Sequence, residues 1–200
     1  VAAVLRTSWL SRGPRVAEFE DAVAQRSGVP HAVAVSSGTA ALHLAVRALG
    51  IGPGDEVVTT PFSFVASANC ILMEGARPVF ADIDDDTLDL DPAALAAAIG
   101  RRTRAVLPVD VFGLTYDAAV DRIARKHRLA ILEDSCEALG ATREGRAAGA
   151  LGDAGAFGFY PNKQITTGEG GMLVTRSARI ARLARSMRNQ GRDRAQWLRH

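Results

Sequence analysis

Short apolar segments alternate with helical patterns along almost the whole chain. One such unit begins with the apolar run at 31–35, continues through the small residues at 36–40, and enters a stretch with apolar side chains at helical spacing. Strands that alternate with helices of about ten residues are typical of βαβ units, whose strands pair in parallel. The sequence therefore predicts an α/β fold with a mostly parallel central sheet and helices on both faces.

Seven segments are predicted as strands, and they lie at 31–38, 55–61, 77–83, 103–113, 129–135, 155–161 and 170–176. Six segments are predicted as helices, and they lie at 14–28, 39–50, 63–75, 91–100, 116–128 and 177–191. Gly28 and Gly50 are the expected helix stops. Asp91 before Pro92 is the expected start of another helix. Because 200 residues can bury one large core, we expect one sizeable domain or most of one.

Composition and charge narrow the functional classes. The formal net charge of +2 is too small to predict a nucleic-acid partner. No apolar run reaches the roughly 20 residues of a membrane span, and no signal-peptide pattern is present. Cys70 and Cys136 have neither metal-ligand spacing nor a disulfide framework around them. We therefore expect a cytoplasmic protein without a metal site or a membrane partner.

The residues that follow each strand are the candidates for a site, because ligands bind beyond the carboxyl ends of the strands in such sheets. At 36–40, the residues SSGTA join a strand to a helix. The free N–H groups and dipole of a helix start favour an anion such as phosphate. An ordinary N-cap at Ser37 or Thr39 explains the same pattern, so both interpretations stay open on the residues alone.

Carboxylates gather at two places in the sequence. Glu133 and Asp134 end a predicted buried strand, where a carboxylate can hold a cationic ring nitrogen or simply cap the next turn. The aspartates of 82–91 form an acidic run that lacks the glycine and the closing glutamate of a calcium loop. We expect that run to be a solvated turn.

The chain has only two lysines, whereas its other basic side chains are arginines and four histidines. Lys126 lies among basic residues on a predicted helix and is expected to be solvated. Lys163 follows a predicted strand, but its neighbours Asn162 and Gln164 exclude a nucleotide phosphate loop. Unlike arginine, lysine can lose its proton and form a Schiff base with an aldehyde.

Together these features predict one site. Pyridoxal phosphate (PLP) needs a lysine for its aldehyde, a carboxylate for its pyridine nitrogen, an aromatic ring against its face and a helix start for its phosphate. The residues that meet these needs are Lys163, Asp134, Phe62 or Phe64, and the helix start at 36–40.

The chain resembles the sugar aminotransferases of the DegT/DnrJ/EryC1/StrS family, which have the aspartate-aminotransferase-like fold. The matching segments occur in order across nearly all of the chain. They are GPRVAEFE, AVAVSSGTAALHLAVRALGIGPGDEVVTTPFSFVASANCI, ARPVFADID, LPVDVFG, ILEDSCEALGA, GDAGAFGFYPNKQITTGEGGMLVT and MRNQGR. The resemblance implies that residues 1–200 are the three-layer α/β/α PLP-binding large domain of a fold type I enzyme. It also implies a C-terminal small domain that is absent from this chain.

The resemblance assigns a role to each candidate residue. Lys163 corresponds to the lysine that forms the internal aldimine with PLP, and Asp134 to the partner of the pyridine nitrogen. Phe64 corresponds to the aromatic residue that stacks on the ring. The phosphate-binding turn of the family matches three consecutive residues, Gly38, Thr39 and Ala40.

The resemblance also implies a reaction and partners. Family members move an amino group, usually from L-glutamate, to a nucleotide-linked keto sugar or a keto-cyclitol, with ping-pong kinetics. They act as homodimers in the biosynthesis of antibiotics, glycolipids or polysaccharides. Two alternatives remain, namely an inactive relative or fragment with a regulatory or scaffold role, and a sugar dehydratase. The dehydratases carry histidine where Lys163 stands, which argues against the second alternative.

Three residues depart from the family pattern. Glu137 stands where many relatives have a glutamine near the phenolic oxygen of the cofactor, and an ionised carboxylate there would repel a phenolate. Gly158 stands where many relatives have a serine that contacts the phosphate. Asp110 stands where relatives often have histidine. Glu137 is still expected among the cofactor-binding residues.

Overall fold

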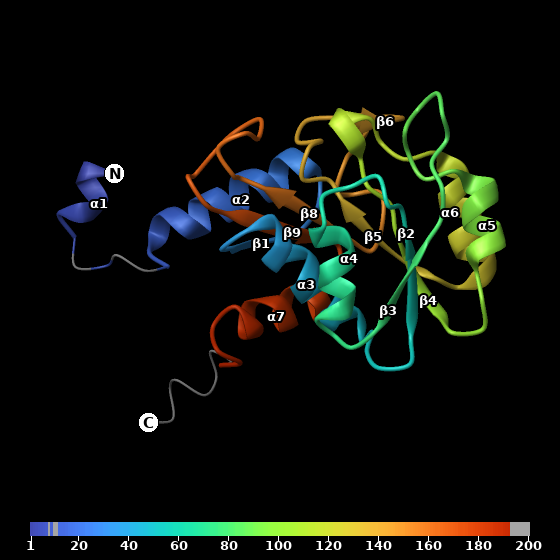
Figure 1. Cartoon of the computed structure of the whole chain (residues 1–200). Coiled ribbons are helices and arrows are strands. Elements are labelled where there is room, and N and C mark those ends of the chain that lie inside the picture. Colours follow the sequence, from blue (N-terminus) through green and yellow to red (C-terminus); the bar gives the residue numbers. More distant parts are fainter. Residues whose placement is uncertain (8, 10–11, 193–200) are drawn as a thin grey trace.

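A seven-stranded sheet forms the centre of the structure, a computed structural model that describes residues 1–7, 9 and 12–192 (Figure 1). The strands follow one another across the sheet in the order β1-β9-β8-β5-β4-β2-β3. Their bounds are β1 His31–Val35, β2 Glu56–Thr59, β3 Arg77–Phe80, β4 Thr103–Leu107, β5 Ala130–Asp134, β8 Ala154–Gly158 and β9 Gly171–Thr175.

Six of these seven strands run in the same direction, and β9 runs antiparallel to both of its neighbours. Consecutive antiparallel strands such as β8 and β9 need no crossover helix between them. The parallel strands all end at the same edge of the sheet, which brings together the segments that follow β1, β2, β5 and β8. The predicted α/β class with a mostly parallel sheet is confirmed.

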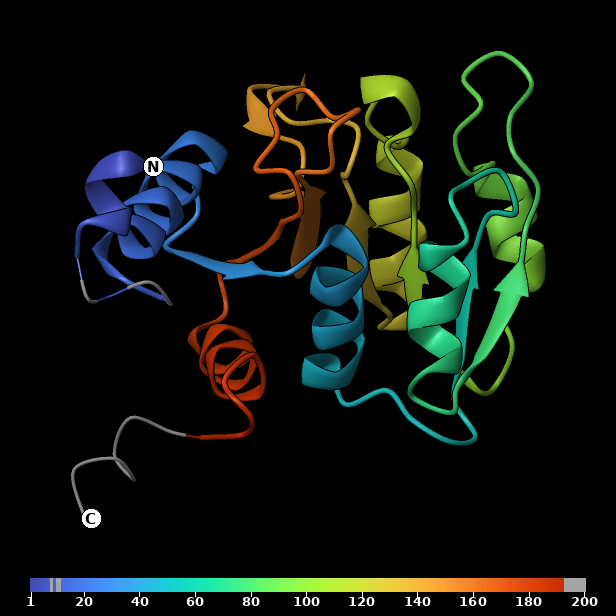
Figure 2. The ribbon, with the colours of Figure 1, turned by 60° about the vertical axis from the view of Figure 1, so that its left-hand side comes forward.

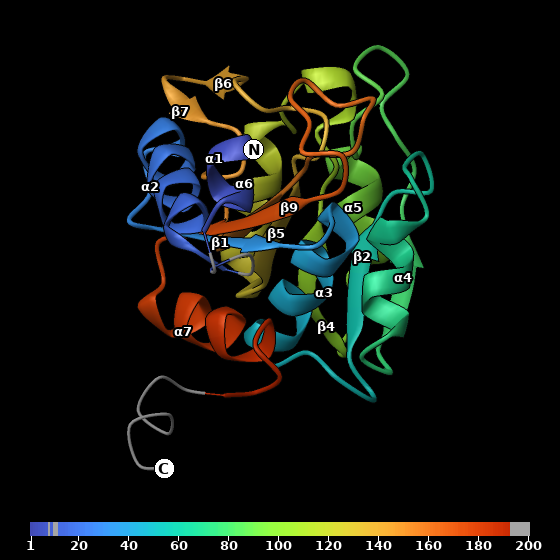
Figure 3. The same ribbon diagram turned by 90° about the vertical axis from the view of Figure 1, so that its left-hand side faces the viewer.

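Helices cover both faces of the sheet, as predicted, and give a three-layer α/β/α structure (Figures 2 and 3). Helices α3, α4 and α7 pack on one face, and α2, α5 and α6 pack on the other. Their bounds are α2 Pro14–Ser27, α3 Gly38–Leu49, α4 Ala66–Leu72, α5 Pro92–Ala98, α6 Ala118–His127 and α7 Ala178–Met187. Within the described part of the chain, no helix combines the length and the apolar character needed to cross a membrane.

Neighbouring residues of a central strand alternate between two cores. In β4, Ala105 and Leu107 pack with α3 and α4, whereas Val106 packs with α5 and α6. All three side chains are fully buried. Because both faces of the sheet are covered, apolar residues occupy consecutive positions in the central strands rather than every second position.

Local signals set several helix ends where the sequence predicts them. The Asp91 carboxylate accepts hydrogen bonds from the N–H groups of Ala93 and Ala94, and Pro92 occupies the first turn of α5. Gly28 ends α2 with a φ of 64°, in the left-handed region that glycine adopts without strain.

Several short elements are absent from the sequence prediction, because too few residues form them to give a periodic pattern. They are α1 Ala2–Leu5 and the hairpin of β6 Thr142–Arg143 with β7 Arg146–Ala147. The strand predicted at 103–113 is wrong at its end, because β4 stops at Leu107 and Val111–Gly113 form a 3-10 turn.

The acidic segment is a turn, but one of its carboxylates is buried. Asp84 accepts hydrogen bonds from the N–H groups of Asp86 and Thr87. Asp89 is only 3% exposed, and its Oδ1 has no hydrogen-bond partner among the described residues. Burial raises the pKa of Asp89 to about 7. The prediction of a solvated turn is therefore wrong at Asp89, because segments distant in sequence bury this side chain.

Candidate active site

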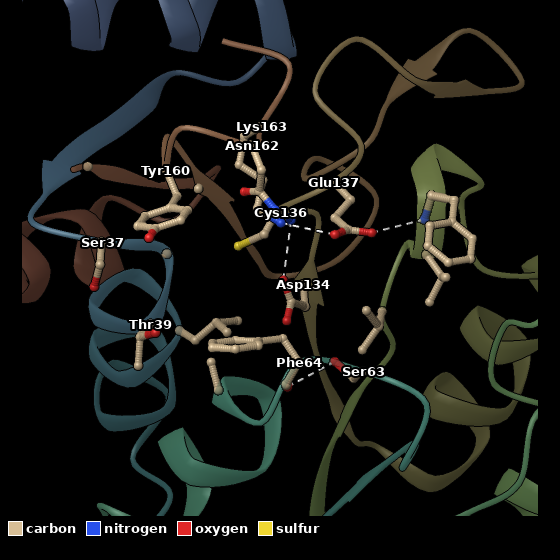
Figure 4. Close-up of a pocket in the computed structure, with 18 of the residues that line it drawn as sticks. Ser37, Thr39, Ser63, Phe64, Asp134, Cys136, Glu137, Tyr160, Asn162 and Lys163 are labelled. Carbon is tan, nitrogen blue, oxygen red and sulfur yellow. Dashed lines mark hydrogen bonds and ion pairs between the residues drawn. The ribbon is translucent and has the colours of Figure 1, made fainter. Parts of the chain in front are cut away.

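A pocket of about 710 Å³ opens at the edge of the sheet where the parallel strands end (Figure 4). A volume of this size suits a small-molecule ligand. The structure brings six of the seven residues predicted for the site into its lining. They are Gly38, Thr39, Phe64, Asp134, Glu137 and Lys163. Ala40, the seventh, is not among the lining residues.

Lys163 reaches the pocket from the loop that follows β8. Its backbone N–H donates to the carbonyl oxygen of Tyr160 at 3.0 Å, which closes a turn around the side chain. Its Nζ donates to Oε1 of Glu137 at 3.0 Å, and the lysine side chain is only 17% exposed. The amine is therefore held at the pocket, where a bound aldehyde could reach it. Lys126, in contrast, is exposed on α6, as predicted.

Asp134 is the last residue of β5 and is 5% exposed. Its Oδ2 accepts a hydrogen bond from Oγ of Ser67 at 2.6 Å, and its Oδ1 accepts one from the N–H of Cys136 at 3.3 Å. Each carboxylate oxygen can accept a second bond, so the group can still hold a cationic ring nitrogen. The contact with Cys136 also caps the following turn, so both sequence interpretations of this carboxylate agree with the geometry.

The helix start at 36–40 forms one wall of the pocket. Ser37 is the N-cap of α3, and its Oγ accepts the N–H of Ala40 at 3.0 Å. The N–H groups of Gly38 and Thr39 lie in the first turn, where no earlier carbonyl of the helix is available to them. The predicted N-cap is thus confirmed at Ser37, and two N–H groups beside it can bind an anion.

Gly38 has no room for a side chain. A Cβ atom there would lie 2.7 Å from Sγ of Cys136 and 3.3 Å from Cα of Gly158. This close approach brings the start of α3 against the ends of β5 and β8. The glycine therefore packs the helix start and the strand ends into a single site.

Aromatic side chains surround the pocket opening. Phe64 is 75% exposed and lines the pocket, so one face of its ring is open to a flat ligand. The rings of Phe62 and Phe112 meet edge to face, with centroids 6.2 Å apart. Tyr160, from the segment after β8, lines the pocket near Lys163 (Figure 4). Phe112 and Tyr160 lie at the ends of predicted strands, where the sequence places candidate site residues, but the sequence predicts no role for either ring.

Glu137 is fixed by both of its carboxylate oxygens. Oε1 pairs with Lys163, and Oε2 accepts the N–H of Phe112 at 3.3 Å. Phe112 has a φ of 52°, an uncommon backbone conformation for a residue with a side chain. The 3-10 turn thus fixes the Glu137 carboxylate, and this carboxylate in turn positions the amine of Lys163.

Asp110 is not among the lining residues of the pocket. It is fully buried, and it accepts hydrogen bonds from Oγ of Ser135 at 2.6 Å and from the N–H of Tyr116 at 3.2 Å. Burial and the nearby charge of Glu133 raise the pKa of Asp110 well above its usual range. Burial also raises the pKa of Glu133 to about 7. Both buried carboxyl groups therefore help to stabilise the structure at this edge of the sheet.

Gly158 leaves space beside the lysine. A Cβ atom there would meet Cβ and Sγ of Cys136 at 3.5 Å and Cε of Lys163 at 3.9 Å, which are ordinary contacts. A small side chain such as serine would fit at this position.

Cys136 lines the pocket, but its thiol is poorly suited to act as a nucleophile. Burial and the negative charge of Asp134 raise the pKa of Cys136 well above its usual range. The thiolate is the reactive form of cysteine. The lysine is thus the better nucleophile of the pocket.

The polar groups of the pocket suit PLP, which is an aldehyde, a pyridine and a phosphate in one molecule. An amine, a buried carboxylate, an open aromatic face and free N–H groups at a helix start all line one cavity. No group of three or more metal-ligating side chains was found in the described part of the chain.

The full chain, residues 1–200, matches the model of the DegT/DnrJ/EryC1/StrS aminotransferase family. It is 48% identical over 201 residues to the spore coat polysaccharide biosynthesis protein SpsC of Bacillus subtilis, covering 100% of this chain and 52% of that protein. It is 46% identical over 195 residues to the GDP-perosamine synthase of Caulobacter vibrioides, covering 96% and 53%.

A solved structure gives the same fold. The PLP form of a putative sugar aminotransferase from Streptococcus pneumoniae matches with a TM-score of 0.86 and 32% identity, covering 90% of this chain and 50% of that one. The chain thus spans about half the length of the proteins it matches.

Proposed function

The chain belongs to the DegT/DnrJ/EryC1/StrS aminotransferase family, and we propose that the protein moves an amino group from L-glutamate to a nucleotide-linked keto sugar or a keto-cyclitol. The single observation that supports this most is the meeting of Lys163 and Asp134 in one pocket, from segments on two different strand ends. One of the matched relatives is named as the synthase of a nucleotide-linked amino sugar.

We propose PLP as the cofactor, with each part of the molecule assigned to residues of the pocket. Asp134 binds the protonated ring nitrogen, Phe64 packs against the ring, and the N–H groups of Gly38 and Thr39 bind the phosphate. Lys163 would bond covalently to the aldehyde carbon, and Glu137, as the hydrogen-bond partner of Lys163, would lie near that bond. PLP supplies an electron sink for the carbanion that forms when the amino donor loses its α-proton.

The side chains then divide the work of the reaction between them. With PLP bound, the amine of Lys163 would be the group that takes the α-proton of the amino donor and delivers it to the former aldehyde carbon of the cofactor. The negative charge of Asp134 stabilises the cationic ring throughout. Glu137 lies beside Lys163 and accepts hydrogen bonds from its ammonium form.

The proposal extends to the surroundings of the site. Residues 1–200 serve as the PLP-binding large domain, and a second copy of the protein completes the substrate site in a homodimer. The exposed phenylalanines around the opening, Phe62, Phe64 and Phe112, support a covered rather than an open site in the working enzyme. Cys70 and Cys136 are free thiols, which is consistent with the reducing cytoplasm.

Amino transfer is tested by incubating the full-length protein with PLP, L-glutamate and candidate keto sugars. We expect glutamate alone to convert the cofactor to its amine form and to release one equivalent of 2-oxoglutarate. A protein that binds PLP but never reacts with an amino donor would instead support the regulatory or scaffold alternative.

A further inference from the structure

A buried serine holds the carboxylate that the proposed function assigns to the ring nitrogen. Ser67 lies in the first turn of α4 and is 1% exposed. Its Oγ lies 2.6 Å from Oδ2 of Asp134, and the hydroxyl is the donor because an ionised carboxylate can only accept. A hydrogen bond of this length to a charged oxygen is a strong one.

A second serine supports the first. Oγ of Ser63 lies 2.6 Å from Oγ of Ser67. The single hydroxyl proton of Ser67 is already used by Asp134, so Ser63 must be the donor in this contact. The other acceptor near Ser63, the carbonyl oxygen of Phe64, is farther away at 3.2 Å. Ser63 therefore donates to Ser67, and Ser67 donates to the Asp134 carboxylate. Hydrogen bonds in such a chain polarise and strengthen one another.

We propose that Ser67, supported by Ser63, is a positioning residue that sets the rotation of the Asp134 carboxylate toward the ring nitrogen of the cofactor. The other oxygen of the carboxylate has only a long 3.3 Å contact with the N–H of Cys136, which holds the group weakly by itself. Without the Ser67 hydroxyl, the carboxylate would turn about its Cβ–Cγ bond. The inference rests on the proposed function of Asp134.

The same chain links the two sides of the cofactor site. Ser63 precedes Phe64 directly, so its bond to Ser67 ties the loop that carries the stacking ring to the carboxylate at the end of β5. The orientation of the carboxylate and the position of the aromatic ring are therefore set together. The loop 60–65 becomes part of the binding machinery, although Phe64 is its only residue with an assigned contact.

The chain offers a matched control for this contact. Ser135 is also fully buried, and its Oγ also donates to an aspartate oxygen at 2.6 Å, that of Asp110. Asp110 does not line the pocket. Ser67→Ala and Ser135→Ala therefore each remove a 2.6 Å hydrogen bond from a serine to a buried aspartate side chain, of which only Asp134 is assigned to the cofactor.

The test uses the full-length protein loaded with PLP. In Ser67→Ala we expect the dissociation constant for PLP to rise about tenfold or more, as for a lost hydrogen bond to a charged group. We expect kcat to fall by a similar factor, with little change in KM for the amino donor, and the pH dependence of the visible cofactor band to shift. Ser67→Thr keeps the hydroxyl and should restore most of each property. Ser63→Ala should give a smaller effect in the same direction.

Thermal unfolding of each variant without cofactor gives the structural effect by itself. Ser135→Ala should also lose stability and yet bind PLP like the wild type. The inference is overturned when Ser67→Ala binds PLP as tightly as the wild type and has the same cofactor spectrum. It is also overturned when Ser135→Ala weakens PLP binding as much as Ser67→Ala does, or when Ser67→Thr fails to restore PLP binding. A wild-type protein in which Lys163 never bonds to PLP contradicts the proposed function itself, and so is distinct from each of these results.

Discussion

The Nζ atom of Lys163 lies 3.0 Å from Oε1 of Glu137, and the turn at Phe112 fixes the same carboxylate from its other oxygen. The proposed nucleophile therefore forms an ion pair with Glu137. An amine attacks an aldehyde only in its uncharged form, and the ion pair holds Nζ against the carboxylate. The pair must separate, or pass on a proton, before the lysine can react.

Removing the charge of Glu137 should speed the reaction of the lysine. In Glu137→Gln the side chain keeps an oxygen for the N–H of Phe112 but no longer stabilises an ammonium group. We expect Lys163 to bond to PLP about two- to fivefold faster at neutral pH, in keeping with the modest strength of a partly exposed ion pair. Stopped-flow absorbance measures this rate. An unchanged or slower rate would show that the ion pair does not restrain the amine.

Removing the charge of Asp134 should damage catalysis far more than replacing its buried neighbour Asp110. Asp134→Asn keeps an acceptor for Ser67 but loses the negative charge beside the ring nitrogen. We expect kcat to fall by at least about a hundredfold, the usual effect of losing a preorganised electrostatic contact. Asp110→Asn is the control, because this buried carboxyl lies outside the pocket lining. Equal losses in the two variants would contradict the assigned role of Asp134.

Two glycines that face each other across β8 and β9 should respond differently to substitution. Gly158 and Gly171 are register partners. A Cβ atom on Gly171 would lie 2.2 Å from the backbone oxygen of Ser37, whereas one on Gly158 would meet its neighbours at 3.5 Å or more. We expect Gly171→Ala to lower the free energy of unfolding by about 2 kcal/mol or more, and to weaken PLP binding by displacing the helix start.

Gly158→Ala serves as the control for Gly171→Ala. We expect its free energy of unfolding to lie within about 1 kcal/mol of that of the wild type. Urea unfolding measures both variants. Similar destabilisation by the two substitutions would contradict the close approach of β9 to the Ser37 turn.

The buried carboxyl of Asp89 should make stability depend on pH. Burial raises its pKa to about 7, against about 4 in an unfolded chain. The folded protein therefore holds a proton that the unfolded chain releases, and this stabilising contribution is lost as the pH rises from about 4 through about 7. Asp89→Asn cannot ionise at this position. The melting temperature of Asp89→Asn minus that of the wild type should therefore rise by a few degrees from pH 5 to pH 8.

Asp84→Asn is the control for this pH effect. Hydrogen bonds from the Thr87 backbone and side chain lower the pKa of Asp84, so this group is ionised in both states over the same pH range. The difference in melting temperature between Asp84→Asn and the wild type should therefore be the same at pH 5 and pH 8. If Asp89→Asn behaves in the same way, Asp89 does not titrate in this range.

The sequence predicts the features that depend on contacts between residues close together in the chain. Asp91 and Pro92 start a helix, and Gly28 ends one, through contacts within a few residues. Lys163 stands out because it is one of only two lysines in an arginine-rich chain. These local signals place most strands and helices, and nominate the lysine, without a structure.

The features that the sequence does not predict depend on contacts between segments that are distant in the chain. Ser67 looks like any small helix residue until β5 brings Asp134 against it, 67 positions away. The burial of Asp89 and the ion pair of Glu137 with Lys163 likewise arise only when the sheet has formed. Pockets at strand ends are built from such contacts, so the sequence can nominate their residues but not their partners.

The central claim is that Lys163 bonds covalently to PLP. The most direct test incubates the full-length protein with PLP, reduces it with borohydride, and locates the modified residue by peptide mass spectrometry. Lys163→Arg is the matched control, because arginine keeps a positive charge in the pocket but cannot form the bond. We predict one pyridoxyl group on Lys163 in the wild type and none in the variant. Modification at Lys126 alone, or an equal yield in Lys163→Arg, would contradict the account.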